Sequence, residues 1–276
     1  EVAVVTNIGL DHQAFLGSDI RSIAKEKAGI FKQGAPVVLG PMRPEAQSEM
    51  LSAALRTSSE VHFARDSEEQ AQPHLGRASS FVTRANIGTA LATLNVLQAL
   101  GWDVPKDAQC RGLSNYPEIT GQKGRWERVD LPAGPTVVFD GAHNVDSVAA
   151  AVEAIESFAA SREGKVHVIW GAGADKDHSD VMALLPTDAS YTWCAADIPR
   201  AMQGADVAKL RPELGGEVCE SPAEALRHCI EEGLENDVIW VGGSLFVVGD
   251  ALRDAPSVVP NWPDSASSDN PAFWKG

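Results

Sequence analysis

The stretch Thr136-Val137-Val138-Phe139-Asp140-Gly141-Ala142-His143-Asn144 decides the fold. Its first four residues form an unbroken apolar run, which is typical of a strand buried on both faces of a parallel sheet. Small and polar residues follow at the point where this strand gives way to a helix, whose apolar positions are Val148, Val152, Ile155 and Phe158. In open α/β sheets, ligands bind at such carboxyl ends of strands.

The same pattern repeats along the second half of the chain. Further strand candidates lie at Val166–Trp170, Tyr191–Ala195 and Val238–Val241, with helix signals at Pro222–Glu232 and from Ser244 onward. Alternating strands and helices with short links indicate a doubly wound, Rossmann-like α/β domain over residues 119–255. Residues 256–276 are rich in Pro, Ser and Asp, which predicts a loose tail.

The first half also alternates between strands and helices. Apolar runs at Val2–Val5 and Val37–Leu39 predict strands, and Glu45–Arg56 predicts a helix, which gives a βαβα order. Between Ser114 and Gly124 the composition turns to Asn, Pro, Gly and Lys, so we expect a domain over residues 1–118 to end there.

Composition and charge narrow the possible functions. The 276 residues carry 23 Lys and Arg against 38 Asp and Glu, a net charge of −15, which disfavours nucleic acid and anionic membranes as partners. No apolar run approaches the roughly 20 residues that span a bilayer, so a cytoplasmic location is expected. The four cysteines lie far apart, which argues against a disulfide framework or zinc site. The chain begins at Glu1, and we expect it to be part of a longer protein.

Three predicted turns carry polar groups with two interpretations each. Asp140 and His143 suit a phosphate or ribose, or else they are a helix cap and a turn residue. Ser244 follows two glycines and suits a carboxylate, or it is an N-cap. Lys176 holds an anionic substrate or pairs with its flanking carboxylates Asp175 and Asp177.

Three further residues stand out by their surroundings. His12 follows a strand and is either a ligand of a divalent ion or a structural residue. Lys27 falls on the apolar face of a predicted helix, where it extends its ammonium to solvent, pairs with a carboxylate or loses its positive charge chemically. Arg125, at the domain junction, suits a phosphate or an ion pair between domains.

Together, these segments resemble the folylpolyglutamate synthase and dihydrofolate synthase family of the Mur ligase superfamily. The resemblance implies the end of a central ATPase-type domain followed by a Rossmann-like C-terminal domain. The motifs that carry it, in chain order, are Thr6–His12 through Leu16-Gly17, Glu26–Ile30, Gly124–Trp126, Asp140–Asn144, Asp175–Asp177, Ile198–Ala201 and Gly242–Phe246.

The family's activity is ATP-dependent ligation of L-glutamate to a pteroate or folate carboxylate through an acyl phosphate, in the cytoplasm and with Mg²⁺. By resemblance, His12 and Lys27 bind the metal, with Lys27 carbamylated, and Asn86 lies beside the adenine. Arg125 and His143 contact phosphates, Asp140 the ribose, and Lys176 and Ser244 the incoming glutamate. His143 and Lys27 are then the candidate catalytic residues, and a monomer that binds only small molecules is expected.

The sequence departs from the family's pattern at two places. No G-x-x-x-x-G-K-[ST] phosphate loop occurs, so we expect the chain to be inactive alone. Thr83-Arg84-Ala85 precedes Asn86, where the family often has His-Gln. Two alternatives remain: another Mur-type ligase of an acid and an amino acid, or a non-catalytic module that has lost the ATPase half.

Overall fold

The computed structural model describes residues 1–10, 16–67, 81–175, 177–260 and 262–263. It divides into two units, Glu1–Gln122 and Lys123–Gly276, which we treat separately. The division after Gln122 falls in the segment between Ser114 and Gly124 that is rich in Asn, Pro, Gly and Lys. The assignment of domains to residues 1–118 and 119–255 stays a prediction. Within the described ranges, no helix has both the length and the apolar character needed to cross a membrane.

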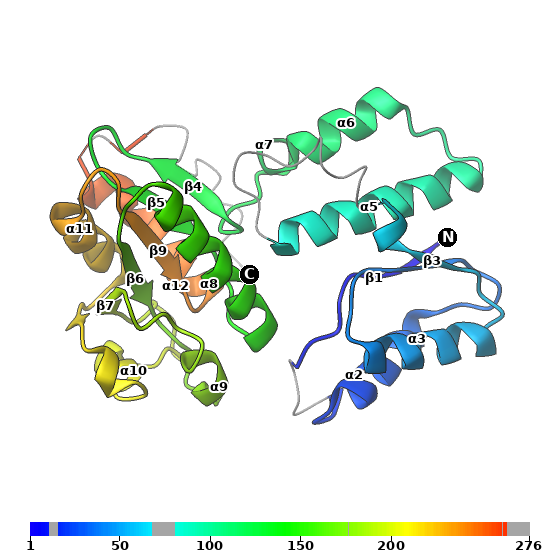
Figure 1. Ribbon diagram of the computed structural model, residues 1–276, viewed down its shortest axis with the longest axis horizontal. Coiled ribbons are helices and arrows are strands. Elements are labelled where there is room, and N and C mark those ends of the chain that lie inside the picture. The colour runs from blue at the N-terminus through cyan, green and yellow to red at the C-terminus, as the bar shows by residue number, and fades with distance from the viewer. Residues whose placement is uncertain (11–15, 68–80, 176, 261, 264–276) are drawn as a thin grey trace. The chain divides into compact units, whose positions relative to one another are not determined.

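A three-stranded parallel sheet forms the centre of the first unit, in the order β1-β2-β3 (Figure 1). Its strands are β1 (Ala3–Val5), β2 (Val37–Leu39) and β3 (Val61–Phe63). Its helices are α2 (Ile20–Lys27), α3 (Pro44–Arg56), α5 (Phe81–Ala99), α6 (Lys106–Ser114) and α7 (Tyr116–Thr120), with 3₁₀ turns η1 (Ala28–Ile30) and η2 (Ala64–Ser67).

Alternating side chains of β2 build a core on each face of this sheet. Val37 and Leu39 point to one face and pack with α2 and α3, where Ile23 and Met50 are buried. Val38 points to the other face and packs against α5. Because successive residues of a strand face opposite sides, a strand covered by helices on both faces needs apolar residues at every position, as in β2.

A six-stranded sheet forms the centre of the second unit, in the order β4-β5-β9-β6-β7-β8. Its strands are β4 (Glu127–Asp130), β5 (Thr136–Phe139), β6 (Val166–Trp170), β7 (Ser190–Trp193), β8 (Glu217–Val218) and β9 (Val238–Gly242). Its helices are α8 (Val145–Ser161), α9 (Ser179–Met182), α10 (Gly204–Ala208), α11 (Pro222–Glu232) and α12 (Leu245–Val258), with a 3₁₀ turn η4 (Pro212–Leu214).

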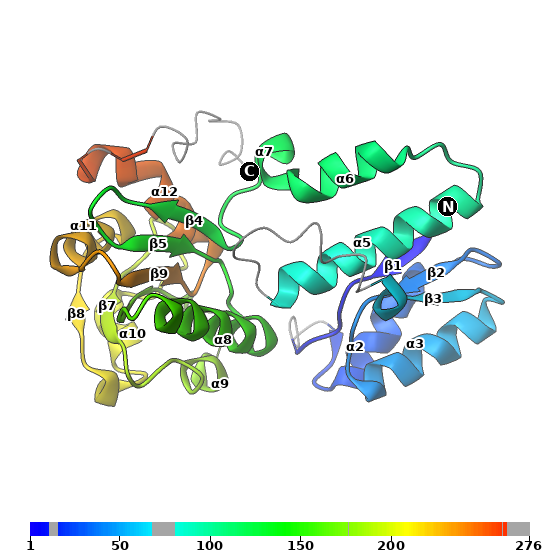
Figure 2. The same cartoon turned by 45° about the horizontal axis from the view of Figure 1, so that its top comes forward.

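Parallel pairing brings the carboxyl ends of five strands, β5, β9, β6, β7 and β8, to one edge of this sheet. The strand β5 pairs in parallel with β9, β9 with β6, and β6 with β7, whereas the edge strand β4 is antiparallel to β5. Helix α8 covers one face, and α11 and α12 cover the other (Figures 1 and 2). The predicted α/β class is therefore confirmed, and the polar turns after β5, β6, β7 and β9 share an edge.

The prediction of a loose tail from residue 256 is wrong for the residues that the structure describes there. Helix α12 continues through Pro256 to Val258, and Trp262 packs edge-on against Phe139 with ring centroids 6.1 Å apart. Ala255 and Val259 are buried with the rest of the α12 face. Their burial outweighs the backbone hydrogen bond that a proline removes from a helix, which is why composition alone misled the prediction.

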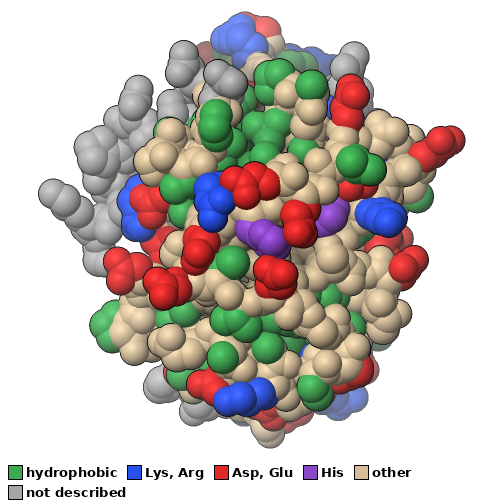
Figure 3. Space-filling view, turned by 90° about the vertical axis from the view of Figure 1, so that its left-hand side faces the viewer, with side chains coloured by type: hydrophobic (Ala, Val, Ile, Leu, Met, Phe, Trp, Pro, Cys, Tyr) green, Lys and Arg blue, Asp and Glu red, His purple; other side chains and the backbone are tan. Residues whose placement is uncertain are grey.

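Acidic side chains are spread over the surface of the α11 side of the molecule, as Figure 3 shows. This surface agrees with the net charge of −15. Most of these carboxylates are solvated, so each contributes little to stability. Asp237 is different, because it is only 4% exposed.

Asp237 makes the second unit sensitive to acid. Burial acts to raise its pKa, but hydrogen bonds from the N–H groups of Leu234 and Lys165 and from His167 outweigh burial and lower the pKa. The ionised form therefore stabilises the fold at neutral pH. This stabilisation is lost as the pH falls below about 4, through the depressed folded pKa.

We expect Asp237→Asn to cost about 1–3 kcal/mol at neutral pH, because either amide orientation turns an NH₂ towards a backbone N–H. Urea unfolding at several pH values measures both the loss and the weaker acid dependence of the variant. Asp206→Asn is the matched control, since Asp206 forms only an exposed pair with Lys209 at 2.7 Å. Equal unfolding midpoints for the two variants would contradict the prediction.

Candidate functional site at the carboxyl ends of the strands

The turn from β5 to α8 begins at Asp140 and ends at Asn144. Asp140 Oδ1 accepts a hydrogen bond from the N–H of Ala142 and Oδ2 accepts one from the N–H of Trp126, both at 2.9 Å. Asn144 caps α8, because its side chain accepts from the N–H of Ser147 at 3.0 Å within a capping box. Asp140 thus joins the turn to the segment that carries Trp126.

The segment Lys123–Glu127 folds back onto this turn. The carbonyl of Gly124 accepts from the N–H of Gly141 at 3.0 Å, and Glu127 Oε2 accepts from the N–H of Gly124 at 2.8 Å. Gly124 has a φ of +67°, and a Cβ there would lie 2.6 Å from Cγ1 of Val248. The segment therefore needs glycine at this position, both for its backbone conformation and for its approach to α12.

Trp126 is the most strained residue of the segment. Its φ is +53°, a conformation that costs a bulky residue about 1–3 kcal/mol. The side chain is only 8% exposed, and its indole N–H has no hydrogen-bond partner among the described residues. The hydrogen bond from its backbone to Asp140 and the burial of its ring hold this conformation. Arg125 stays exposed beside Asp140 as a result.

The Asp140 carboxyl has a raised pKa. Burial is the main cause, and it outweighs the hydrogen bonds from Ala142 and Trp126 and the nearby charges of Arg125 and His143, all of which act to lower the pKa. A buried carboxyl with a raised pKa beside Arg125 and His143 at a strand end marks a candidate functional site.

His143 is oriented by its own turn. Its Nδ1 lies 2.8 Å from the carbonyl oxygen of Gly141. Because a carbonyl only accepts, Nδ1 carries the proton, and in the neutral ring the lone pair is on Nε2. His143 is half-buried and precedes α8, whose N-terminus favours negative charge.

The turn from β9 to α12 lies next to the β5 turn. Asp140 donates its backbone N–H to Val241 at 3.0 Å, and a Cβ on Gly141 would collide with the side chain of Leu245. Ser244 is the N-cap of α12, and its hydroxyl accepts from the N–H of Phe246 at 3.2 Å. The N-cap interpretation of Ser244 is thus confirmed.

The ends of β6 and β7 bring a third charged group to the same edge. Arg200 donates to Asp175 at 3.1 Å, and its guanidinium lies 5.2 Å from the ring centroid of Phe246. The N–H of Ala174 donates to the carbonyl of Arg200 at 2.8 Å and ties the two loops together. Lys176 lies outside the described residues.

The predicted site residues of the first unit are either exposed or outside the described residues. His12 lies outside the described residues. Lys27 is exposed at the end of α2, one turn after the buried Ile23 and Ala24, which agrees with the alternative that it extends its ammonium to solvent. Asn86 is exposed on α5.

Sequence reasoning missed the cluster of Asp175, Arg200 and Phe246. Asp175 and Phe246 lie in recognised motifs, and Ile198–Ala201 was a further motif with no role assigned. The signal available was position: all three follow strands whose carboxyl ends meet at one edge.

No metal cluster accompanies these residues. Within the described ranges, no group of three or more His, Cys, Asp or Glu side chains could hold a metal ion. The positive charges of Arg125 and Arg200 at the strand ends suit an anion.

Residues 124–245 match the family model described as "Mur ligase, glutamate ligase domain". The matched residues contain all six strands of the second unit and the strand-end turns described above, so this unit is similar to a Mur ligase domain. Over 90% of its length, the chain is 30% identical to a probable bifunctional folylpolyglutamate synthase/dihydropteroate synthase of Haloferax volcanii. Over 92% of its length, it is 30% identical to the dihydrofolate synthase/folylpolyglutamate synthase of Escherichia coli. The family resemblance predicted from the motifs is confirmed.

A solved structure shows the same similarity. Escherichia coli FolC in complex with DHPP and ADP matches 90% of this chain with a TM-score of 0.68 and 25% identity, and the match covers 59% of that protein. The chain spans 31% of the length of the Haloferax relative and 60% of that of the Escherichia coli enzyme.

Proposed function

We propose that this chain is part of a cytoplasmic, ATP-dependent ligase that joins L-glutamate to the carboxylate of a pteroate or folate through an acyl phosphate. The proposal depends on one observation at the N-terminus of α8. Hydrogen bonds of Gly124 and Trp126, the neighbours of Arg125, hold this residue beside the turn that carries Asp140 and His143. The names of the relatives support the choice of acid and amino acid.

The residues of this turn suit a nucleotide. Arg125 offers a fork of donors for phosphate oxygens, and it is exposed while the backbone beside it is fixed. Each Asp140 oxygen accepts one backbone hydrogen bond and has a second lone pair for a ribose hydroxyl. The ADP in the Escherichia coli FolC complex supports this assignment.

Charge neutralisation explains how these groups would assist the reaction. A carboxylate that attacks the γ-phosphate brings two anions together, so the barrier falls when fixed positive charge meets the charge that develops. On the side of this unit, Arg125 would provide that stabilisation, and His143 would add to it through Nε2–H in its imidazolium form, because Nδ1–H already donates to Gly141. The second step requires the glutamate amine to be aimed at the acyl phosphate, which is a matter of positioning.

Glutamate has two carboxylates distant from its reacting nitrogen. We propose that Arg200 binds one of them, because Asp175 and Phe246 hold its guanidinium at the same sheet edge. Ser244 and Lys176 remain proposed partners of the glutamate, and Ser244 would donate its hydroxyl proton while its oxygen caps α12.

Replacing Ser244 with alanine separates these two roles. We expect the loss of the N-cap to cost about 1 kcal/mol and the KM for glutamate to rise while kcat changes little. Ser221→Ala is the matched control, because Ser221 caps α11 in the same way, accepting from the N–H of Glu224 at 3.2 Å. Equal KM values in the two variants would restrict Ser244 to capping.

The metal and the adenine contact rest on resemblance alone. Mg²⁺ would neutralise phosphate charge, but the described residues supply no cluster of ligands for it. His12 and Lys27 therefore remain proposed ligands, and Asn86 a proposed adenine contact. The exposure of Lys27 removes the physical argument for its carbamylation.

The test is glutamate-dependent phosphate release by the intact protein, with dihydropteroate and tetrahydrofolate compared as acceptors. We expect release with at least one acceptor and a product heavier by one glutamate, and no release by the 276-residue chain alone. Release that depends on another acid or amino acid would indicate a different Mur-type ligase. The absence of ATP-dependent release from the intact protein would favour a non-catalytic module.

A further inference from the structure

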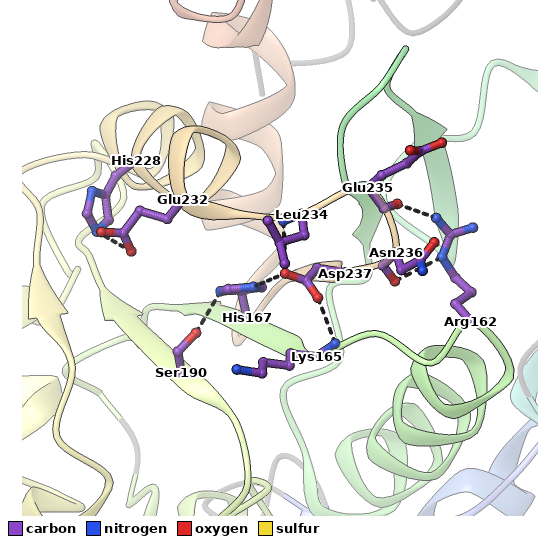
Figure 4. A network of polar contacts seen from close by, with 10 residues as sticks. All are labelled: Arg162, Lys165, His167, Ser190, His228, Glu232, Leu234, Glu235, Asn236 and Asp237. Carbon is purple, nitrogen blue, oxygen red and sulfur yellow. Dashed lines mark hydrogen bonds and ion pairs between the residues drawn. The ribbon is translucent and has the colours of Figure 1, made fainter.

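A serine, a histidine and an aspartate form a hydrogen-bonded line at the amino ends of the strands of the second unit. Ser190 opens β7, His167 lies in β6, and Asp237 directly precedes β9. His167 and Ser190 are register partners on neighbouring parallel strands, so their side chains stand on the same face of the sheet. Figure 4 shows the line running from Ser190 through His167 to Asp237.

The contacts of Asp237 set the protonation of His167. Asp237 Oδ2 lies 3.0 Å from His167 Nε2, and the same carboxylate accepts the backbone N–H groups of Leu234 at 2.9 Å and Lys165 at 2.8 Å. A carboxylate only accepts, so Nε2 carries the proton. The lone pair of the neutral ring is then on Nδ1, 2.7 Å from the Ser190 hydroxyl, which therefore donates to it.

Burial decreases along the line. Asp237 is 4% exposed, the His167 side chain is 13% exposed, and Ser190 is exposed. The hydroxyl thus meets solvent while its base is held from behind by a buried anion. A nucleophile in contact with a base, and the base in contact with a residue that orients it, is the arrangement that activates a serine.

Burial does not explain the contact between Ser190 and His167. An exposed hydroxyl such as that of Ser190 can form its hydrogen bonds with water. Asp237 does not need the serine either, because its carboxylate already accepts from two backbone N–H groups and from His167. The hydroxyl of Ser190 instead contacts Nδ1 of His167, the ring nitrogen that can accept its proton. Its chemistry, rather than its packing, distinguishes this serine from an ordinary surface serine.

We propose that Ser190 is a nucleophile that takes acyl groups from activated esters, at a site separate from the strand-end site of the ligase. Oγ attacks the ester carbonyl carbon as its proton passes to Nδ1 of His167. The bond from carbon to the leaving oxygen then breaks, and that oxygen takes the proton from Nδ1. An acyl ester of Ser190 and a free alcohol result, and Asp237 acts as the positioning residue that stabilises the transient imidazolium.

Acetylation of the folded 276-residue chain by p-nitrophenyl acetate tests this proposal. Peptide mass spectrometry measures the rate at which Ser190 gains an acetyl group, with Ser161 as the reference within the same molecule. Ser161 is also exposed, but its hydroxyl donates to the carbonyl of Phe158 at 2.7 Å and has no base. We expect Ser190 to react about 10²-fold faster than Ser161.

Two histidine variants separate base catalysis from simple accessibility. His167→Gln should reduce the rate at Ser190 to that at Ser161. His228→Gln should leave it unchanged, because His228 contacts only carboxylates in the described structure, Glu217 at 3.1 Å and Glu232 at 3.4 Å. Circular dichroism verifies that both variants are folded.

The proposal is overturned if Ser190 reacts no faster than Ser161 in the unmodified chain, a comparison that needs no variant. It is also overturned if folded His167→Gln retains the full rate. Both readouts are independent of nucleotide and glutamate, so they test Ser190 whatever the ligase assays show.

Discussion

Replacing His143 with alanine should reduce glutamate-dependent phosphate release by the intact protein by about 10²-fold or more. The contact of Nδ1 with the carbonyl of Gly141 at 2.8 Å fixes the ring, so His143 would meet a phosphate through Nε2, which donates a hydrogen bond in the imidazolium form. A preoriented donor next to a helix N-terminus acts where charge develops in the reaction, and water does not replace it.

The fold should tolerate this change. Helix α8 begins with the capping box between Asn144 and Ser147, and that box does not use the imidazole of His143. Urea unfolding should therefore give nearly the same midpoint as the unmodified protein. His228→Ala is the matched control, since it removes a partly exposed imidazole on α11. Normal turnover by His143→Ala would refute the role assigned to this residue.

The strands and their carboxyl-end turns could be predicted because both leave local signals. A strand buried on both faces needs consecutive apolar residues, as at Val137, Val138 and Phe139, all of which are fully buried. The turn that follows needs Gly and polar residues, and its place next to β9 follows from parallel pairing. The short strands β3, β4 and β8 lack such runs and were not predicted.

Side-chain direction was harder to predict where a helix is short. Lys27 is the last residue of α2, and its spacing from Ile20, Ile23 and Ala24 fits an apolar stripe. The buried α2 residues are Ile23 and Ala24, one turn before Lys27, whereas Lys27 itself is exposed. Periodicity indicates a stripe without showing where the stripe stops.

The contact between Arg200 and Phe246 could not be predicted because it depends on strand order. Arg200 follows β7 and Phe246 follows β9, and β6 lies between these strands in the sheet. Nothing local to either residue shows that β9 inserts between β5 and β6. The sequence supplies the candidate groups, and only the topology shows which of them meet.

Asp140→Ala should have the largest effect on stability, a loss of about 2–5 kcal/mol. The substitution leaves two backbone N–H groups without acceptors, those of Trp126 and Ala142, each at about 1–3 kcal/mol when buried. It also removes the contact that holds Trp126 at a φ of +53°. Urea unfolding and calorimetric ADP binding to the intact protein measure the two consequences.

Asp206→Ala is the matched control, because Asp206 is an exposed aspartate paired with Lys209 at 2.7 Å, and such pairs contribute less than about 1 kcal/mol. An unfolding midpoint for Asp140→Ala equal to that of this control would contradict the prediction.

Asp140→Asn distinguishes the hydrogen bonds that Asp140 accepts from Trp126 and Ala142 from the effect of its charge. Burial raises the pKa of Asp140, which means that the folded state disfavours its ionised form, so removing the charge is not itself costly. Asparagine keeps one acceptor and loses the other, and we expect a stability between those of the unmodified protein and Asp140→Ala. ADP affinity should fall in parallel, because Arg125 is positioned by the backbone that Asp140 holds. If ADP affinity fell while stability stayed unchanged, Asp140 would act by contact with the nucleotide alone, and the strained Trp126 would have no part in placing Arg125.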